Sequence, residues 1–275
     1  MGRSKSGVVV AWLAGAALWP AWLAAAPLPV VRFSADEWPP FVSADLPGDG
    51  LSGALVAAVY QRLGMQSQIE YFPWKRAMEF GLHNPRYAGL LPVWRTPERE
   101  KLCHFSSPIG STQTVLAYLK TAPVRPDTLA GLRGVRLGTV AGYAYGEQFD
   151  AARARGDVSP DEGVNDETNL RKLLIGRYAV IVIERHVLDY LLHTPQFGAG
   201  ERARVGHADK LFRERPVTVC FKHTAQGQEQ QKAFNNAARE LDLERLEKEY
   251  WQRAHLDGGN APHRTGALPM RPVAD

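Results

Sequence analysis

The chain of 275 residues has few cysteines and little excess of either charge. It has two cysteines, Cys103 and Cys220, and their spacing fits no zinc-binding motif. The net charge is +4, from 33 basic and 29 acidic residues, with no concentrated basic stretch. Nucleic-acid-binding proteins usually carry a clustered basic surface, so the composition argues against a nucleic-acid partner. No segment resembles a nucleotide-binding loop, and we expect no cofactor or metal ion.

The two cysteines leave two arrangements open. Both flank apolar runs, and free cysteine is often buried in protein cores. An oxidising compartment would permit a disulfide between them. The sequence does not decide between a disulfide and two separate buried thiols.

Long apolar runs are also absent, apart from one at the N-terminus. Two basic residues precede an apolar segment at 8–19, and three alanines follow at 24–26, which is the order found in secretory signal peptides. The alternative is an uncleaved membrane anchor, but the segment falls short of the roughly 20 residues that a spanning helix needs. We therefore expect residues 1–26 to be a signal peptide and the mature protein to be exported.

Strands and helices alternate through the rest of the chain, which predicts an α/β fold. Apolar patterns and turn residues predict strands at 30–35, 69–72, 88–93, 115–120, 135–139, 180–183 and 216–222. They predict helices at 54–63, 75–82, 145–155, 169–175, 186–192, 228–241 and 243–251. Residues 258–275 are rich in glycine, proline and short polar side chains, so we expect a disordered tail there.

One group of elements is repeated. Residues 75–93 and 169–183 each contain a helix, an Arg-Tyr-Ala tripeptide and an apolar strand. One interpretation is two similar lobes, each a small doubly wound sheet, that face each other across a cleft. The alternative is that any two βαβ units look alike at this level.

The segment from Trp74 to Pro108 is the most informative part of the chain. It combines Trp-Lys-Arg-Ala at 74–77, an apolar strand, Thr-Pro-Glu-Arg at 96–99 and Phe-Ser-Ser-Pro at 105–108. This order and spacing resemble the bacterial periplasmic solute-binding proteins of the polar amino-acid type, family 3 of the extracellular solute-binding proteins of ABC transporters. The resemblance covers roughly residues 30–252.

The resemblance implies a two-lobed periplasmic-binding-protein fold of type II, hinged by two crossing strands. Lobe 1 is expected at 27–115 and 218–257, lobe 2 at 116–217, and the crossings near 114–120 and 216–222. The implied function is that of a monomeric periplasmic receptor. Such a receptor would close over a small carboxylate-bearing solute, an amino acid or a related polar or aromatic acid, and serve an ABC importer or a sensor.

Arg99 is the leading candidate for contact with the solute. It follows a buried strand, and open α/β sheets bind ligands outside the carboxyl ends of their strands. Its planar guanidinium can hold a carboxylate through two parallel hydrogen bonds. The resemblance assigns the carboxylate to Arg99, with Thr96 at the matching threonine. The alternative is a solvated arginine in the charged run 95–101.

Three tryptophans are expected at the cleft. Trp38 and Trp74 follow neighbouring strands and can stack on a flat ligand or hold a cation, unless they only fill the core. Trp94, with Pro92 shortly before it, stands where amino-acid receptors tend to carry small serines, so it would intrude into the cleft or cover it. Arg76, next to the Trp74 position, is a further candidate.

The second lobe contributes two further groups. Gly142, Tyr143 and Ala144 lie where a strand meets a helix, and the resemblance places carboxylate-binding backbone N–H groups there. The alternative is an ordinary turn. Glu184 stands where the resemblance places an aspartate that binds the ligand ammonium, although glutamate is one methylene longer. A helix-capping role is its alternative.

The amino-acid clamp is therefore only half present, and the solute need not be a standard amino acid. A second function is an enzyme on the same scaffold, similar to the cyclohexadienyl dehydratases. In that hypothesis Glu184 donates a proton in a partly apolar cleft.

Overall fold

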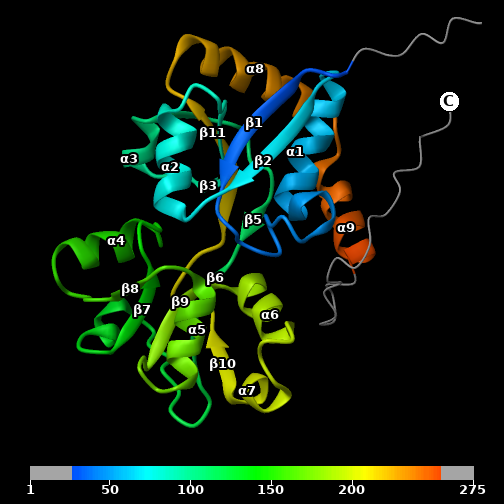
Figure 1. Cartoon of the computed structure of the whole chain (residues 1–275). Helices are drawn as coiled ribbons and strands as arrows, with labels where there is room; N and C mark the ends of the chain where they lie inside the picture. The colour runs from blue at the N-terminus through cyan, green and yellow to red at the C-terminus, as the bar shows by residue number, and fades with distance from the viewer. Residues whose placement is uncertain (1–26, 255–275) are drawn as a thin grey trace, which may run out of the picture.

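The computed structural model describes residues 27–254, which form two α/β lobes joined at a narrow waist (Figure 1). The first sheet has the order β2-β1-β3-β11-β4, with β5 on β11, and the second has the order β10-β6-β9-β7-β8. The predicted two-lobed α/β fold is thus confirmed. The predicted signal peptide lies outside the described residues, as does the predicted tail.

The first lobe is built from both ends of the described chain. Its strands are β1 (Val30–Ala35), β2 (Gln66–Tyr71), β3 (Gly89–Trp94), β4 (Cys103–Phe105), β5 (Ser111–Thr112) and β11 (Arg215–Lys222). Its helices are η1 (Pro47–Asp49), α1 (Gly50–Arg62), α2 (Trp74–His83), α3 (Pro97–Glu100), α8 (Ala225–Arg239) and α9 (Leu243–Ala254). Strands β2, β1 and β3 are parallel neighbours, and every residue of β3 is buried, as expected for a central strand covered by helices.

The second lobe repeats this plan on a smaller scale. Its strands are β6 (Thr114–Leu119), β7 (Leu137–Val140), β8 (Asp161–Gly163), β9 (Val180–Glu184) and β10 (Val205–Ala208). Its helices are η2 (Leu129–Leu132), α4 (Glu147–Ala154), α5 (Asp166–Leu174), α6 (Arg185–His193) and α7 (Ala199–Arg204). The fully buried β9 lies between β6 and β7.

The chain crosses between the sheets just before each strand that was predicted to cross. Thr112 pairs with Arg215 in the first sheet, and Thr114 pairs with Glu184 in the second. The first crossing is therefore at Gln113, and the second lies between β10 and β11. The strands predicted near the crossings, at 114–120 and 216–222, correspond to β6 and β11, which begin directly after them.

The cysteines form a disulfide. Cys103 and Cys220 lie on the neighbouring strands β4 and β11, with 5.5 Å between their Cα atoms. Of the two arrangements left open by the sequence, the structure has the disulfide.

Candidate functional site

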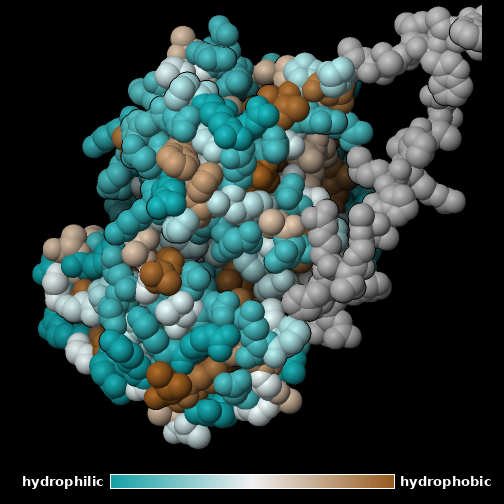
Figure 2. All heavy atoms as spheres, viewed as in Figure 1, coloured by the Kyte–Doolittle hydropathy of each residue, from teal (hydrophilic) through white to brown (hydrophobic). Residues whose placement is uncertain are grey.

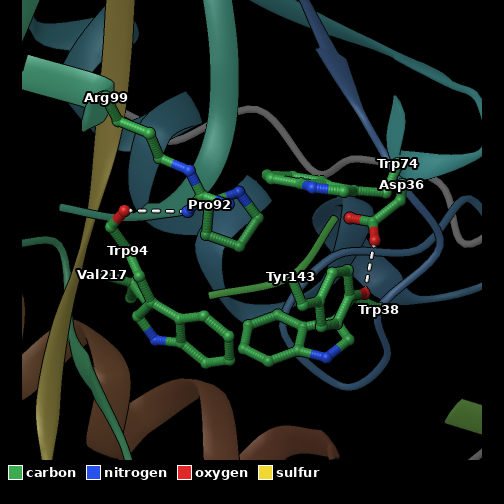
Figure 3. A pocket seen from close by; sticks show the side chains of 8 residues that line it. All are labelled: Asp36, Trp38, Trp74, Pro92, Trp94, Arg99, Tyr143 and Val217. Carbon is green, nitrogen blue, oxygen red and sulfur yellow. Dashed lines mark hydrogen bonds between the residues drawn. The ribbon is translucent and has the colours of Figure 1, made fainter. Parts of the chain in front are cut away.

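A small cavity lies between the lobes, at the carboxyl ends of the first lobe's parallel strands. It is lined by Asp36, Trp38, Trp74, Pro92, Trp94, Arg99, Tyr143 and Val217 (Figure 3). Of the described residues that line it, only Tyr143 comes from the second lobe. The volume is about 20 Å³, close to the space that one water molecule occupies.

Strand order explains why these side chains meet. Asp36 directly follows β1, Trp74 follows β2 as the first residue of α2, and Trp94 is the last residue of β3. The three strands are parallel neighbours, so their carboxyl ends share one sheet edge. Trp38 is held above this edge by a loop that pairs back on itself through Val42.

Arg99 is a buried cation without a carboxylate partner. It is 7% exposed, donates from Nη1 to the Trp94 carbonyl (2.9 Å) and lies over the Trp74 ring, 5.1 Å from its centroid. Among residues 27–254 it forms no ion pair, and burial lowers the pKa of Arg99 to about 10. An unpaired buried charge is costly, which makes Arg99 a strong attractor for an anion.

Thr96 acts on Arg99 through the backbone. Its hydroxyl accepts a hydrogen bond from the Arg99 backbone N–H (3.2 Å) and so caps the short helix α3. Thr96 is outside the wall of the cavity. It therefore positions the arginine and does not itself face the cavity.

A second arginine, which the sequence analysis did not identify, lies behind Trp94. Arg215 begins β11, and its guanidinium carbon is 4.2 Å from the centroid of the Trp94 ring. It donates to the Ala144 carbonyl across the waist (3.2 Å), and burial lowers the pKa of Arg215 to about 10. The signal available in the sequence was its position at the start of a strand that returns to the first lobe.

Tyr143 fills the space between the tryptophans. Its ring meets Trp74 and Trp94 edge-on, with centroids 5.5 Å and 6.1 Å away. Its hydroxyl donates to the Asp36 carboxylate at 2.5 Å (Figure 3). Asp36 was also missed from the sequence, and burial raises the pKa of this carboxyl to about 6. A solute that enters between the tryptophans must displace the Tyr143 ring.

The turn at Gly142 differs from its prediction. The helix expected from 145 begins at Glu147, so the turn does not present a helix N-terminus to the cavity. Instead the Gly142 carbonyl accepts from Trp74 Nε1 (2.9 Å) and Arg99 Nη2 (3.3 Å). In this arrangement carbonyl oxygens, and not N–H groups, face the cations. Gly142 adopts φ +80°, a conformation that glycine tolerates best.

Glu184 caps a helix in this structure. Its carboxylate accepts from the backbone N–H of Val187 (2.9 Å) and of Gln113 (3.1 Å), and it contacts His186 Nδ1 (3.2 Å). This geometry matches the helix-capping alternative. The structure thus gathers Trp38, Trp74, Trp94, Arg99 and Tyr143 at the cavity. It leaves Thr96, Gly142, Ala144, Glu184 and the exposed Arg76 outside its wall.

Two further features bear on the site. No group of His, Cys, Asp or Glu within residues 27–254 is arranged to hold a metal ion. In the same range, no helix has the length and apolar character needed to cross a membrane. The face shown in Figure 2 is mainly hydrophilic, with small separate apolar patches.

Comparison with known proteins gives a consistent result. Residues 31–252 match the family of bacterial extracellular solute-binding proteins, family 3. No curated protein sequence gives a significant match.

Solved structures share the fold at low sequence identity. A substrate-binding protein of an amino-acid ABC transporter from Streptococcus pneumoniae, bound to L-arginine, has a TM-score of 0.66 at 15% identity and covers 81% of this chain and 94% of that chain. A histidine kinase sensor domain with similarity to periplasmic binding proteins has a TM-score of 0.70 at 16% identity, covering 85% and 98%. An ancestral amino-acid-binding protein, a precursor of cyclohexadienyl dehydratase, has a TM-score of 0.65 at 17% identity, covering 82% and 94%. Such likenesses establish the fold and not the ligand.

Proposed function

This chain belongs to the bacterial extracellular solute-binding proteins of family 3, and from that premise we propose that it is a periplasmic receptor that closes over a small carboxylate-bearing solute. The observation that carries the proposal is Arg99, a buried guanidinium without a carboxylate partner in residues 27–254, at the rim of a cavity walled by tryptophans. The solute would be an amino acid or a related polar or aromatic acid. Delivery to an ABC importer or to a sensor would follow closure.

Two features support export to the periplasm. The predicted signal peptide at 1–26 has the composition of secreted proteins. The Cys103–Cys220 disulfide is typical of proteins that fold outside the reducing cytosol.

The test is thermal denaturation of the purified protein with a panel of small carboxylates. A ligand at about 100 times its Kd adds about 2.7 kcal/mol to the free energy of unfolding, which is a shift of several degrees in Tm. We expect Arg99→Ala to abolish the shift and Arg99→Lys to weaken it strongly, because lysine cannot make the two-pronged contact.

Arg95→Ala is the matched control for this experiment. Arg95 belongs to the same charged run, is largely exposed and pairs with Glu100. Its removal is expected to leave ligand binding unchanged. A shift that survives in Arg99→Ala, or no shift with any carboxylate, would contradict the proposal.

The dehydratase remains the second candidate, because a buried carboxyl with a raised pKa lines the cavity. That group is Asp36. Glu184, which the sequence suggests as the proton donor, lies outside the cavity wall and accepts hydrogen bonds from backbone N–H groups. Turnover of prephenate or arogenate that disappears in Asp36→Asn or Glu184→Gln would support an enzyme. We expect a receptor to give no turnover.

A further inference from the structure

A second cavity, with a volume of about 340 Å³, opens beside the first one. One wall is the first-lobe loop from Glu37 to Asp45, and the opposite wall is the start of α5 together with one face of α6. The Trp38 side chain lines both cavities, so its indole separates the Arg99 end from this second space. We call the second cavity the acidic pocket, for the carboxylates of Glu37, Asp45, Asp166 and Glu167 that line it.

The charges around the acidic pocket are of one sign. None of the described residues that line it is a lysine, arginine or histidine. Glu167 is paired with Arg171 at 2.9 Å. The other three acids form no ion pair within residues 27–254, so no basic side chain in that range is paired with them. At the Arg99 end of the cleft the unpaired side chain is instead a cation.

Asp166 is a buried acid in the wall of the acidic pocket. Its side chain lines the acidic pocket although the residue is only 6% exposed. Within residues 27–254, the charged groups that act on it are the carboxylates of Asp36 and Glu184, and no cation does so. Burial is the main reason that the pKa of Asp166 is raised to about 8. A buried acid in this setting gains from a cation placed next to it.

The indole of Trp38 is a second buried polar group at the same place. Trp38 is 6% exposed, and its N–H lowers the pKa of Asp166 without forming a hydrogen bond of ordinary geometry. Trp38 and Tyr190 also contribute aromatic rings to the pocket wall. Aromatic faces attract ammonium and guanidinium groups, which adds to the attraction of the acids.

We propose that the acidic pocket is a cation subsite, which takes the ammonium or guanidinium group of a solute whose carboxylate Arg99 holds. This inference rests on the proposed function, since it needs Arg99 as the carboxylate anchor. It also assigns a geometry to the solute. Glu184 is occupied as a helix cap, so the cationic group lies beyond Trp38 and is remote from the carboxylate. The substrate class is a carboxylate with an amine or guanidine at the far end of its chain.

The experiment is titration calorimetry of the full chain with 5-aminopentanoate, 4-guanidinobutanoate and pentanoate. The first two carry the remote cation, and pentanoate lacks it. We expect at least one cationic compound to bind about tenfold more tightly than pentanoate, or better, since about 1.4 kcal/mol corresponds to tenfold in Kd. The order of the two cationic compounds identifies the preferred group.

Two substitutions test whether the acids cause the preference. In Asp166→Asn the ratio of affinities between the cationic compound and pentanoate is expected to fall toward one. Glu37→Gln changes an exposed residue, so it leaves folding intact and is expected to lower the same ratio about threefold, as for a screened charge. Asp127→Asn is the matched control, because Asp127 is an exposed acid outside the pocket lining. This variant is expected to keep the wild-type ratio of affinities between the cationic compound and pentanoate.

The outcomes separate this inference from the function on which it rests. Equal binding of pentanoate and the cationic compounds, with dependence on Arg99, overturns the cation subsite and leaves the carboxylate receptor standing. A preference that persists in Asp166→Asn and Glu37→Gln also overturns it. Absence of binding by every carboxylate tried overturns both.

Discussion

Single residues set the chemistry of the cleft through groups that lack their usual partners. Arg99 is buried and Arg215 is half-buried. Their guanidiniums donate to backbone carbonyls and to the Thr114 hydroxyl, and both lie over tryptophan rings. Asp36 is a buried carboxyl that accepts a hydrogen bond from the Tyr143 hydroxyl. Each of these contacts is weaker than an ion pair with a fitting solute would be. These are therefore contacts that a ligand can replace.

The hydrogen bond from Tyr143 to Asp36 stabilises the folded protein. Tyr143→Phe removes the hydroxyl and leaves a buried carboxylate without its donor, which costs about 1–3 kcal/mol. We expect the free energy of unfolding, measured in urea at pH 7, to fall by about that amount.

A matched control comes from Tyr250, a half-buried tyrosine whose hydroxyl is buried. The Tyr250 hydroxyl has no hydrogen-bond partner within the described part of the chain. Tyr250→Phe is therefore expected to change the stability by less than about 0.5 kcal/mol, or to increase it. Equal losses in both variants would show that the Tyr143 contact with Asp36 has no special weight.

The candidate site was only partly predictable from the sequence. Trp38, Trp74, Trp94, Arg99 and Tyr143 were identified because they follow strand ends or stand in a family motif. Asp36 was missed, although it directly follows the first strand and the same argument applies to it. Arg215 and Asp166 could not be found this way, because their place depends on how two distant segments cross at the waist and on which helix end faces the loop after β1.

Among the elements, those with their own apolar pattern were predictable and those that depend on a partner were not. All seven predicted strands and all seven predicted helices overlap elements of the structure. The missed ones are short, such as β4, β5 and β8, which have three residues or fewer. A strand of that length shows no period of its own and exists because a neighbour pairs with it.

Pro92 shows how one residue shapes an element. Proline has no N–H to donate to a ladder and usually disrupts a central strand. Here β11 slips in register between Thr218 and Cys220, next to the part of β3 that contains Pro92. A bulge of this kind leaves a residue unpaired in the ladder, so it can accommodate a proline, which has no N–H. It also changes the direction of the residues that follow. Trp94 is the last residue of this irregular strand, and Arg99 lies in α3, the next element along the chain.

The Cys103–Cys220 disulfide stabilises the first sheet. It joins β4 to β11 across 117 residues of sequence, a separation for which the loss of chain entropy in the unfolded state is large. The double variant Cys103→Ala/Cys220→Ala is expected to lose about 2–5 kcal/mol of unfolding free energy. The measurement is urea denaturation with and without a reductant. The reductant should destabilise the wild type and have no effect on the double variant. Unchanged stability on reduction of the wild type would contradict the prediction.

At the scale of the whole molecule, the two lobes bring like charges together across the cleft. Asp36 belongs to the first lobe and Asp166 to the second, and the Asp36 carboxylate contributes to the raised pKa of Asp166. In the folded state the pKa is about 6 for Asp36 and about 8 for Asp166, against 3.8 for both without burial. At a pH between the unfolded and the folded value, each of these carboxyls is therefore protonated in the folded protein and ionised in the unfolded chain.

The sign of the pH dependence follows from this difference. Stability from a raised carboxyl pKa is complete below the unfolded value and is lost as the pH rises through the folded value. Other charged groups near these acids are Arg99, Glu37 and Glu184. His186, with its pKa raised mainly by a hydrogen bond to Glu184, contributes in the same direction. We expect the free energy of unfolding to fall by about 2 kcal/mol or more between pH 5 and pH 8.5, since each unit of pKa difference is worth about 1.4 kcal/mol.

Urea denaturation across this pH range, with three matched variants, tests the assignment. Asp36→Asn and Asp166→Asn each remove one titrating group, so each is expected to flatten the decline, and the pair together to remove most of it. Asp127→Asn, at an exposed site, should keep the wild-type profile. A wild-type stability that stays level or rises from pH 5 to pH 8.5 would mean that these carboxyls are already ionised in the folded protein. In that case the cleft would present permanent negative charge to an incoming solute, and the protein would close against that repulsion.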